Sequence, residues 1–142
     1  SAFFVDSNII MYAVGAEHPY RRPCLDALER IIRESLPAVV SSEVHQEILH
    51  RYMSLGQGQL ALEISVRLET LIPTTLPVTL ADIRRARQLA THYPAIKARD
   101  LVHAAVMLEN GISCIVSTDR HFDQVAEIDR LDPRDFGGAE MQ

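Results

Sequence analysis

The sequence predicts an α/β sandwich in which helices flank a mostly parallel sheet. Residues 3–5 are an apolar run without polar alternation, which is typical of a strand buried on both faces of a parallel sheet. Residues 112–116 form a second such run near the other end of the chain. Between them, segments with apolar residues at helical spacing alternate with short β-branched runs, and this order favours parallel strands joined by helices.

The first half of the chain is expected to alternate between strands and helices. After the strand at residues 3–5, Asp6-Ser7-Asn8 turns the chain into a short helix that Gly15 ends. Pro23 stands where a helix can begin, because its fixed φ and missing N–H suit the first turn. The predicted elements of this half are a helix over residues 9–14, a helix from 23 to about 36, a strand at 38–40 and a helix over 43–53.

The second half contains one segment with an ambiguous pattern. In residues 60–71 the apolar side chains fit both a strand and a helix, and the length without Gly or Pro favours a helix. Thr79 and Asp82 resemble a capping box, and Gly111 lies where a glycine commonly ends a helix. The predicted elements of this half are a helix over 60–71, a small strand beginning at 78, a helix from 80 to before 94, a helix over 99–110, a strand at 112–116, a helical turn or loop at 120–123 and an edge strand at 128–131.

Length and composition limit the class of protein. A chain of 142 residues has the size of one domain, so we expect a single domain over residues 1–142. It has no apolar stretch of 18 residues and no signal-peptide pattern, which favours a cytoplasmic protein without a membrane span. Cys24 and Cys114 form no CxxC motif, and Cys114 is expected to be a small buried residue rather than a reactive thiol.

The charge pattern leaves the partner open. A net charge of −5 argues against a nucleic-acid partner. However, 13 of the 14 basic residues are arginines, whose guanidinium groups bind phosphate in a bidentate manner. A local patch that binds phosphate is therefore compatible with the acidic chain.

Acidic residues recur where the predicted strands end and the predicted helices begin. They are Asp6 and Asp119 at strand ends, Asp100 in the first turn of a helix, Glu43 and Glu47 four residues apart on one helical face, and Asp123 four residues after Asp119. The carboxyl ends of parallel strands share one edge of the sheet, so these carboxylates could converge there. A cluster of this kind needs a counter-charge, and hard divalent cations with oxygen ligands supply one. Each acid could instead cap a helix or face solvent.

Four segments containing these acids resemble, in order, the motifs of PIN-domain ribonucleases, and among these the VapC toxins of bacterial toxin–antitoxin pairs. The segments are Phe4-Val5-Asp6-Ser7-Asn8, Ser41-Ser42-Glu43-Val44-His45-Gln46-Glu47-Ile48, Arg99-Asp100-Leu101-Val102-His103-Ala104-Ala105 and Ser117-Thr118-Asp119-Arg120-His121-Phe122-Asp123. Each is weak alone, but the resemblance covers residues 3–132. It implies a three-layer sandwich, a metal-dependent endoribonuclease that acts on RNA, a homodimer and a VapB-like antitoxin partner.

The resemblance also implies a ligand set for Mg²⁺ or Mn²⁺. Asp6, Glu47, Asp100 and Asp119 match the acidic quartet of the family, and Asp123 matches a frequent fifth acid. Glu47 fits better than Glu43, because the glutamate of the family usually precedes an aliphatic pair, but Glu43 stays the alternative. Ser7 stands where the family often has threonine, and its hydroxyl could orient a carboxylate.

Other readings of these residues remain open. For His103 and His121 a structural or surface role is favoured over metal ligation, and the chain has no zinc-binding spacing. A catalytically silent PIN-like module that only binds a protein is the alternative function. An aspartyl-phosphate phosphatase would need a second aspartate where Asn8 stands.

Several apolar side chains in the middle of the chain cannot all lie on one face of a helix. They are Leu55, Leu60, Leu62 and Val66, and we expect some of them to be exposed in the isolated chain. An exposed apolar surface is typical of an interface, which could receive an amphipathic antitoxin helix. Packing beneath the loop at residues 56–58 or a homodimer contact would explain the same pattern.

Overall fold

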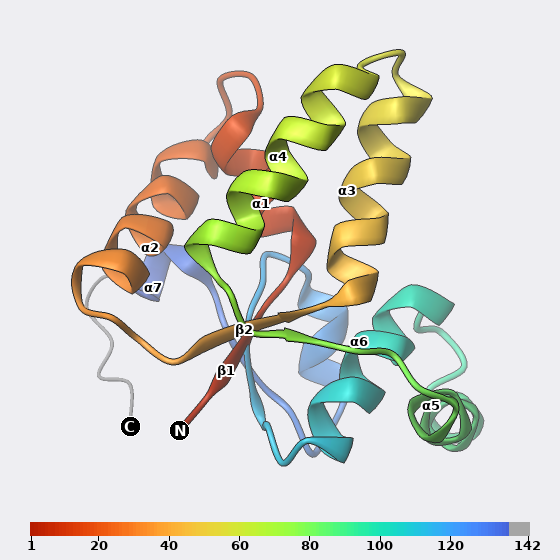
Figure 1. The fold of residues 1–142 in the computed structure, drawn as a ribbon. Helices are drawn as coiled ribbons and strands as arrows, with labels where there is room; N and C mark the ends of the chain where they lie inside the picture. Colours follow the sequence, from red (N-terminus) through yellow and green to blue (C-terminus); the bar gives the residue numbers. More distant parts are fainter. Residues whose placement is uncertain (137–142) are drawn as a thin grey trace.

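A five-stranded parallel sheet forms the centre of the computed structural model, which describes residues 1–136 (Figure 1). The strands lie in the order β3-β2-β1-β4-β5, and neighbours pair in parallel. Their bounds are β1 Phe3–Val5, β2 Ala38–Ser41, β3 Thr75–Leu76, β4 Cys114–Val116 and β5 Asp129–Leu131. β1 is central, because Phe4 is in register with Val39 on one side and with Ile115 on the other.

Helices flank this sheet on both sides, which confirms the predicted sandwich. In Figure 1, α1 to α4 lie above the sheet, and α5 and α6 lie below it and to the right. The bounds are α1 Ser7–Val14, α2 Arg21–Arg33, α3 Ser42–Ser54, α4 Gly58–Leu71, α5 Leu80–His92, α6 Ala98–Glu109, the 3-10 helix η1 Arg120–Gln124 and α7 Pro133–Phe136. Within residues 1–136, no helix is both long and apolar enough to cross a membrane.

Local capping explains where several helices begin and end. α1 starts at Ser7, two residues earlier than predicted, because the Asp6 side chain accepts a hydrogen bond from the Ser7 N–H. Thr79 and Asp82 form the predicted capping box of α5, with each side chain bound to the backbone N–H of the other. Gly111 has a φ of +68°, which suits a glycine after the last turn of α6.

The strand predicted to begin at Val78 was wrong. The strand lies earlier, where Thr75 and Leu76 pair with β2. Pro77 then interrupts the pairing, because it has no N–H to donate to the neighbouring strand. The Val78 N–H instead donates to the Ser42 hydroxyl over 3.2 Å.

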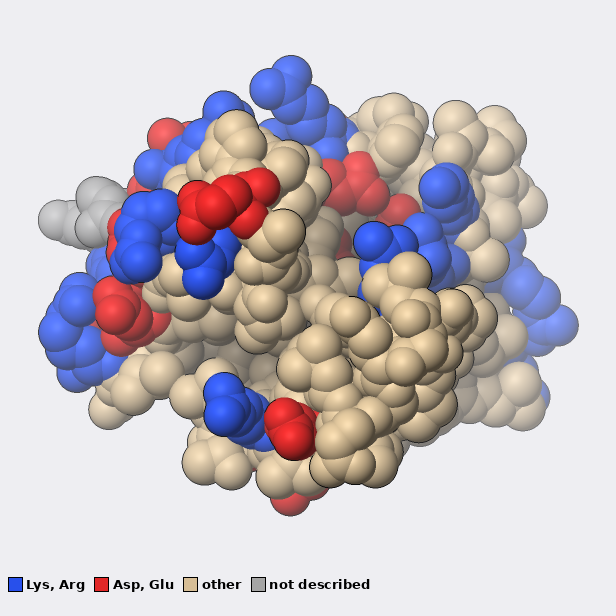
Figure 2. Space-filling model, turned by 90° about the horizontal axis from the view of Figure 1, so that it is seen from above, with Lys and Arg blue, Asp and Glu red and all other residues tan. Residues whose placement is uncertain are grey.

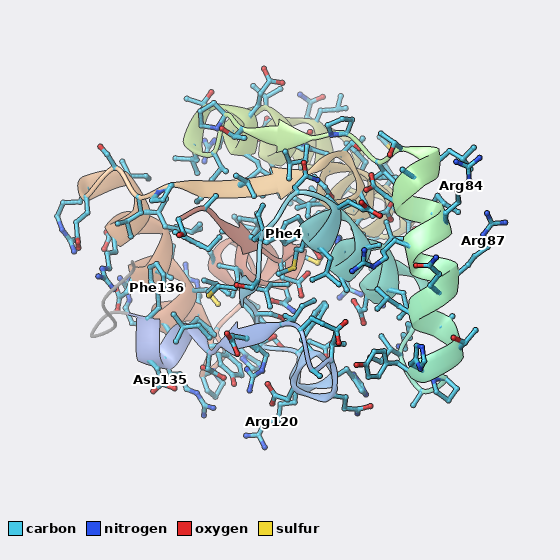
Figure 3. The ribbon with its side chains drawn as sticks, turned by 90° about the horizontal axis from the view of Figure 1, so that it is seen from below. Phe4, Arg84, Arg87, Arg120, Asp135 and Phe136 are labelled. Atoms are coloured by element: carbon cyan, nitrogen blue, oxygen red, sulfur yellow. The ribbon has the colours of Figure 1, made fainter. Side chains whose placement is uncertain are left out.

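The hydrophobic core surrounds β1 and the middle of α6. Phe3, Phe4 and Val5 are fully buried, which confirms a strand covered on both faces. Figure 3 shows Phe4 inside the molecule, whereas Arg84 and Arg87 extend from α5 into solvent. Cys114 is only partly buried at the start of β4, so the prediction of a buried residue does not hold there. The tight packing of β1 fixes the point at which Asp6 leaves the sheet.

Candidate active site

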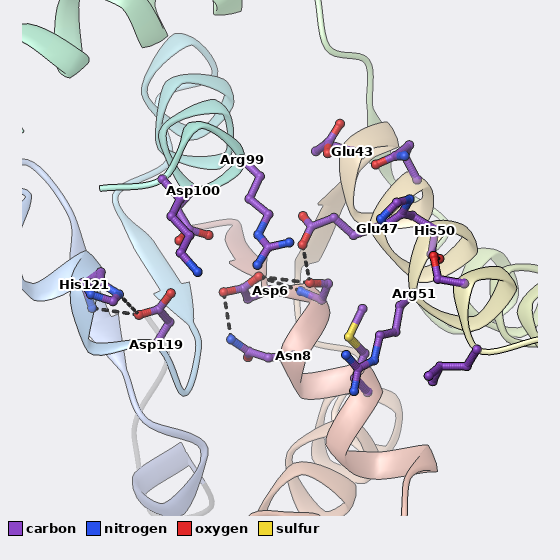
Figure 4. Close-up of a pocket in the computed structure, with 16 residues that line it drawn as sticks. Asp6, Asn8, Glu43, Glu47, His50, Arg51, Arg99, Asp100, Asp119 and His121 are labelled. Carbon is purple, nitrogen blue, oxygen red and sulfur yellow. Dashed lines mark hydrogen bonds and ion pairs between the residues drawn. The ribbon is translucent and has the colours of Figure 1, made fainter. Parts of the chain in front are cut away.

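Five of the six predicted acids, the four of the quartet and Glu43, line one pocket of about 490 Å³ at the carboxyl end of the sheet (Figure 4). Asp6 follows β1, Asp119 follows β4, Glu47 projects from α3 and Asp100 lies in the first turn of α6. These elements are far apart in the sequence, and the parallel order of the strands brings them together. The structure therefore brings together the four acids of the quartet that the family resemblance implied.

Asp6 is the most deeply buried of these acids and is held by several hydrogen bonds. Its Oδ1 accepts from the Ser7 N–H over 2.7 Å. Its Oδ2 accepts from the Ser117 hydroxyl over 2.7 Å and from the Asn8 amide over 3.1 Å. Burial raises the pKa of Asp6 above its ordinary value, although the nearby His103 and the Ser117 hydroxyl act in the opposite direction. The carboxylate is thus fixed in orientation.

Both carboxylate oxygens of Glu47 are already bound. Its Oε2 accepts from the Ser7 hydroxyl over 2.9 Å, and its Oε1 accepts from His103 Nε2. Burial by itself would raise the pKa of Glu47, but the bond from His103 and its charge lower it below the ordinary value. Glu43 lies one turn earlier in the same pocket, and burial together with the charge of Glu47 raises its pKa.

Asp100 and Asp119 form the opposite wall of the pocket. Asp100 is buried, and burial together with the charges of Asp6 and Asp119 raises its pKa to about 7. Asp119 accepts from the backbone N–H of His121 over 2.9 Å and from its ring Nδ1 over 2.7 Å. Burial by itself would raise the pKa of Asp119, but these hydrogen bonds lower it below its ordinary value.

The structure does not bring Asp123 to the pocket. Its carboxylate forms a bidentate pair with Arg130, with distances of 2.9 Å to Nε and 3.2 Å to Nη2. Asp123 is also absent from the residues that line the pocket. The same guanidinium donates to the backbone carbonyl of Ser117 over 2.9 Å. Asp123 therefore stabilises the chain segment that carries Asp119.

Three further polar residues complete the site. Asn8 and Ser117 bind Asp6, and His103 binds Glu47. Asn8 and Ser117 stand within the motifs that contain Asp6 and Asp119, but a motif does not reveal which side chains point inward. For His103 the signal was its spacing of three residues from Asp100, which places both on one face of α6.

Basic side chains also line this pocket. Arg51 from α3, Lys97 before α6 and Arg99 in α6 form no ion pair within 4.0 Å in residues 1–136. The view from above in Figure 2 shows acidic side chains in a hollow with basic side chains beside it. Cations of this kind at the rim of a pocket suit a substrate that carries phosphate groups.

The donor set of the pocket fits a hard divalent cation. Its acidic groups are carboxylates, whose oxygens are the ligands that Mg²⁺ and Mn²⁺ prefer. Burial raises the pKa of Asp6 and of Asp100, and the charges of neighbouring carboxylates add to this effect, so a bound cation would favour the ionised form of both groups. Within residues 1–136, no three His, Cys, Asp or Glu side chains are arranged closely enough to hold a metal ion together.

Comparison with known proteins assigns a family to this arrangement. The family model described as PIN domain matches residues 3–128. Ribonuclease VapC13 of Mycobacterium tuberculosis is 35% identical over 127 residues, which cover 89% of this chain and 97% of the relative. Ribonuclease VapC23 of the same species is 36% identical over 116 residues, which cover 82% and 91%. The structure of VapBC2 from Rickettsia felis, bound to a DNA fragment of its promoter, superposes with a TM-score of 0.75 at 13% identity, covering 92% of this chain and 98% of the other.

Proposed function

Because the chain belongs to the PIN-domain family, in which it groups with the VapC ribonucleases, we propose that it is an endoribonuclease that depends on Mg²⁺ or Mn²⁺. It would cleave RNA phosphodiester bonds in the cytoplasm and act as the toxin of a toxin–antitoxin pair. One observation carries the proposal: Asp6, Glu47, Asp100 and Asp119 come from four separate elements and line one pocket.

Each group in the pocket has a role in this proposal. Asp6, Asp100, Asp119 and Glu47 would hold the cation, and Ser117 would keep Asp6 in its orientation. When bound, the cation supplies positive charge that lowers the pKa of water and stabilises the leaving oxygen during phosphodiester cleavage.

The basic residues of the rim would bind the substrate. Arg51 and Arg99 extend from different helices and face the same pocket, so they could contact phosphates on either side of the bond that is cleaved (Figure 4). This arrangement explains how an acidic chain can bind RNA. Arg51, Lys97 and Arg99 would supply positive charge for the phosphates at this place, although the net charge of the whole chain is −5.

A VapB-like antitoxin is the partner that we propose. A groove of about 500 Å³ runs between α1, α2 and α4, and most of the residues that line it are apolar. Leu55, Leu60, Leu62 and Val66, some of which were expected to be exposed, are between 37% and 67% exposed, and of these four Leu60 lines the groove. Apolar area of this kind could receive an amphipathic antitoxin helix or the second subunit of a homodimer.

The test of the proposed activity is cleavage of RNA by the purified, partner-free protein. Total RNA is incubated with the protein, with and without Mg²⁺ or Mn²⁺, and new 5′ ends are mapped. We expect new ends at a restricted set of sites only when the cation is present. The matched control is the Asp100→Asn protein, which should produce none of them. Cleavage that continues in a metal chelator, or that survives Asp100→Asn, would contradict the proposal.

A further inference from the structure

A histidine that cannot reach the substrate contacts two of the pocket acids from inside the protein. His103 lies on α6 three residues after Asp100, so both side chains share one face of the helix. The imidazole is fully buried, and Phe4 packs on it with ring centroids 5.3 Å apart. An RNA bound in the pocket could therefore not touch His103.

The ring is oriented by its contacts with the two carboxylates. His103 Nε2 donates to Glu47 Oε1 and lies 3.8 Å from Asp6 Oδ1. The other ring nitrogen, Nδ1, is buried and has no hydrogen-bond partner in the described part of the chain. In the described part of the chain, the ring of His103 therefore forms one hydrogen bond, from Nε2 to Glu47.

The same glutamate is held from the other side by Ser7. The Ser7 hydroxyl donates to Glu47 Oε2 over 2.9 Å, so each oxygen of Glu47 has one donor. A carboxylate oxygen has two lone pairs, and one on each oxygen stays available for a cation. Glu47 is therefore held in one rotamer before any ligand binds.

We propose that His103 is a positioning residue, which fixes Glu47 so that its carboxylate and that of Asp6 face the cation site in a set geometry. This inference rests on the proposed function, because it concerns how the pocket holds a cation. Groups that orient the ligands of a metal typically change metal affinity or activity by about 10–100-fold when they are removed.

Two amide variants separate this role from simple packing. The amide nitrogen of glutamine can reach the place of Nε2, whereas that of asparagine ends near the place of Nδ1 and falls short of Glu47. We expect His103→Gln to bind Mn²⁺ nearly as well as wild type, and His103→Asn to bind it about 10–100-fold more weakly. The measurement is calorimetric titration with Mn²⁺ alone, without RNA. His45→Gln is the control, since His45 bonds to Ser65 and lies outside the pocket.

The kinetic constants for RNA cleavage should differ between the two variants in the same way as their affinity for Mn²⁺. The His103→Asn protein should lose kcat for RNA cleavage and keep the KM for RNA, because the residue does not contact solvent. Equal affinity for Mn²⁺ in wild type, His103→Gln and His103→Asn would overturn the proposal and leave His103 as packing. Equal losses of Mn²⁺ affinity in His103→Gln and His103→Asn would also overturn the proposal, because a donor at the place of Nε2 would then not be sufficient.

A second measurement keeps the inference testable if the asparagine variant does not fold. Long-range ¹⁵N–¹H spectra of metal-free wild type should show the His103 proton on Nε2. In a separate titration, Ser7→Ala should bind Mn²⁺ more weakly than wild type, because the variant removes the hydrogen bond to the other oxygen of Glu47. A proton on Nδ1 alone, or unchanged affinity in Ser7→Ala, would contradict the role of positioning. These results do not involve RNA, so wild type that binds Mn²⁺ but cleaves no RNA would refute only the proposed function.

Discussion

At the scale of single residues, Asp6 combines two properties that are often separate. Its carboxylate caps α1, and it also lines the pocket between the other acids. A capping carboxylate at the surface is usually ionised with little cost, whereas burial raises the pKa of Asp6. The position of Asp6 is therefore suited to binding a ligand, although burial there disfavours its charged form.

The first prediction concerns Asp6→Asn. Asparagine keeps an oxygen that accepts from the Ser7 N–H and removes a charge that burial disfavours. We therefore expect unchanged or slightly higher thermal stability, together with a loss of RNA cleavage of about 100-fold. Thermal unfolding and cleavage rates at saturating Mn²⁺ give the two quantities. Full cleavage activity in this variant would remove Asp6 from the ligand set.

The second prediction concerns the pH dependence of the metal-free protein. The pKa of Asp100 is about 7 in the folded state and about 3.8 in the unfolded state. Between these values the folded state binds more protons, so the free energy of unfolding should fall as pH rises from about 4 to about 7. The raised pKa of His103 adds a loss of the same sign as pH rises above about 6.5. The pKa values of Glu47 and Asp119 are lowered, so these two groups reduce the free energy of unfolding only when pH falls below their ordinary pKa values.

Urea unfolding in a chelating buffer at several pH values measures this slope. Asp100→Asn should make the stability of the metal-free protein less dependent on pH between about 4 and 7, because it removes the group responsible. The exposed Asp26 provides a matched control, Asp26→Asn, which should leave the slope as in wild type. A wild-type slope that is flat, or one that Asp100→Asn leaves unchanged, would show that the pKa of Asp100 is not raised in the folded protein.

At the scale of elements, the turn between β4 and β5 is held by one arginine. Arg130 in β5 binds Asp123, the carbonyl of Ser117 and Asp132, so it joins both ends of the segment that carries Asp119. Its side chain is largely buried, whereas that of Asp123 is half exposed. The ion pair therefore stabilises the segment without lining the pocket.

The third prediction separates this role of Asp123 from metal ligation. Asp123→Asn should lower the stability by about 1 kcal/mol at most, because half-exposed ion pairs contribute little. Its affinity for Mn²⁺ should stay close to that of wild type, whereas Asp119→Asn should lose about 10–100-fold. Calorimetric titration of both variants makes the comparison. Equal losses of affinity would restore Asp123 as a ligand.

The fourth prediction concerns the exposed apolar side of α4. Leu62 is 51% exposed, so Leu62→Glu should leave thermal stability nearly unchanged and weaken either antitoxin binding or the homodimer. Antitoxin affinity and the mass of the isolated protein are measured separately. Leu80→Glu on α5, where the leucine is 60% exposed, is the matched control. If both variants behave as wild type, this side of α4 is ordinary surface.

At the scale of the whole molecule, the order of helices and strands could be predicted from the sequence more accurately than the contacts between side chains. The apolar run of β1 and the helical spacing of α6 identified two central elements, because the buried positions of both are occupied mainly by apolar residues. β3 was misplaced, since a two-residue strand followed by Pro77 has too little pattern to detect. The pairing of Asp123 with Arg130 and the contact of His103 with Glu47 depend on tertiary packing between separate elements, which the spacing within one element does not encode.

The central claim is that four carboxylates from separate elements form one divalent-cation site. Diffraction from crystals soaked in Mn²⁺, recorded at the manganese absorption edge, tests this most directly. We predict an anomalous peak in the pocket, bound by oxygens of Asp6 and Asp100 and close to Asp119 and Glu47. A pocket without such a peak, or a peak beside Asp123 instead, would contradict the account.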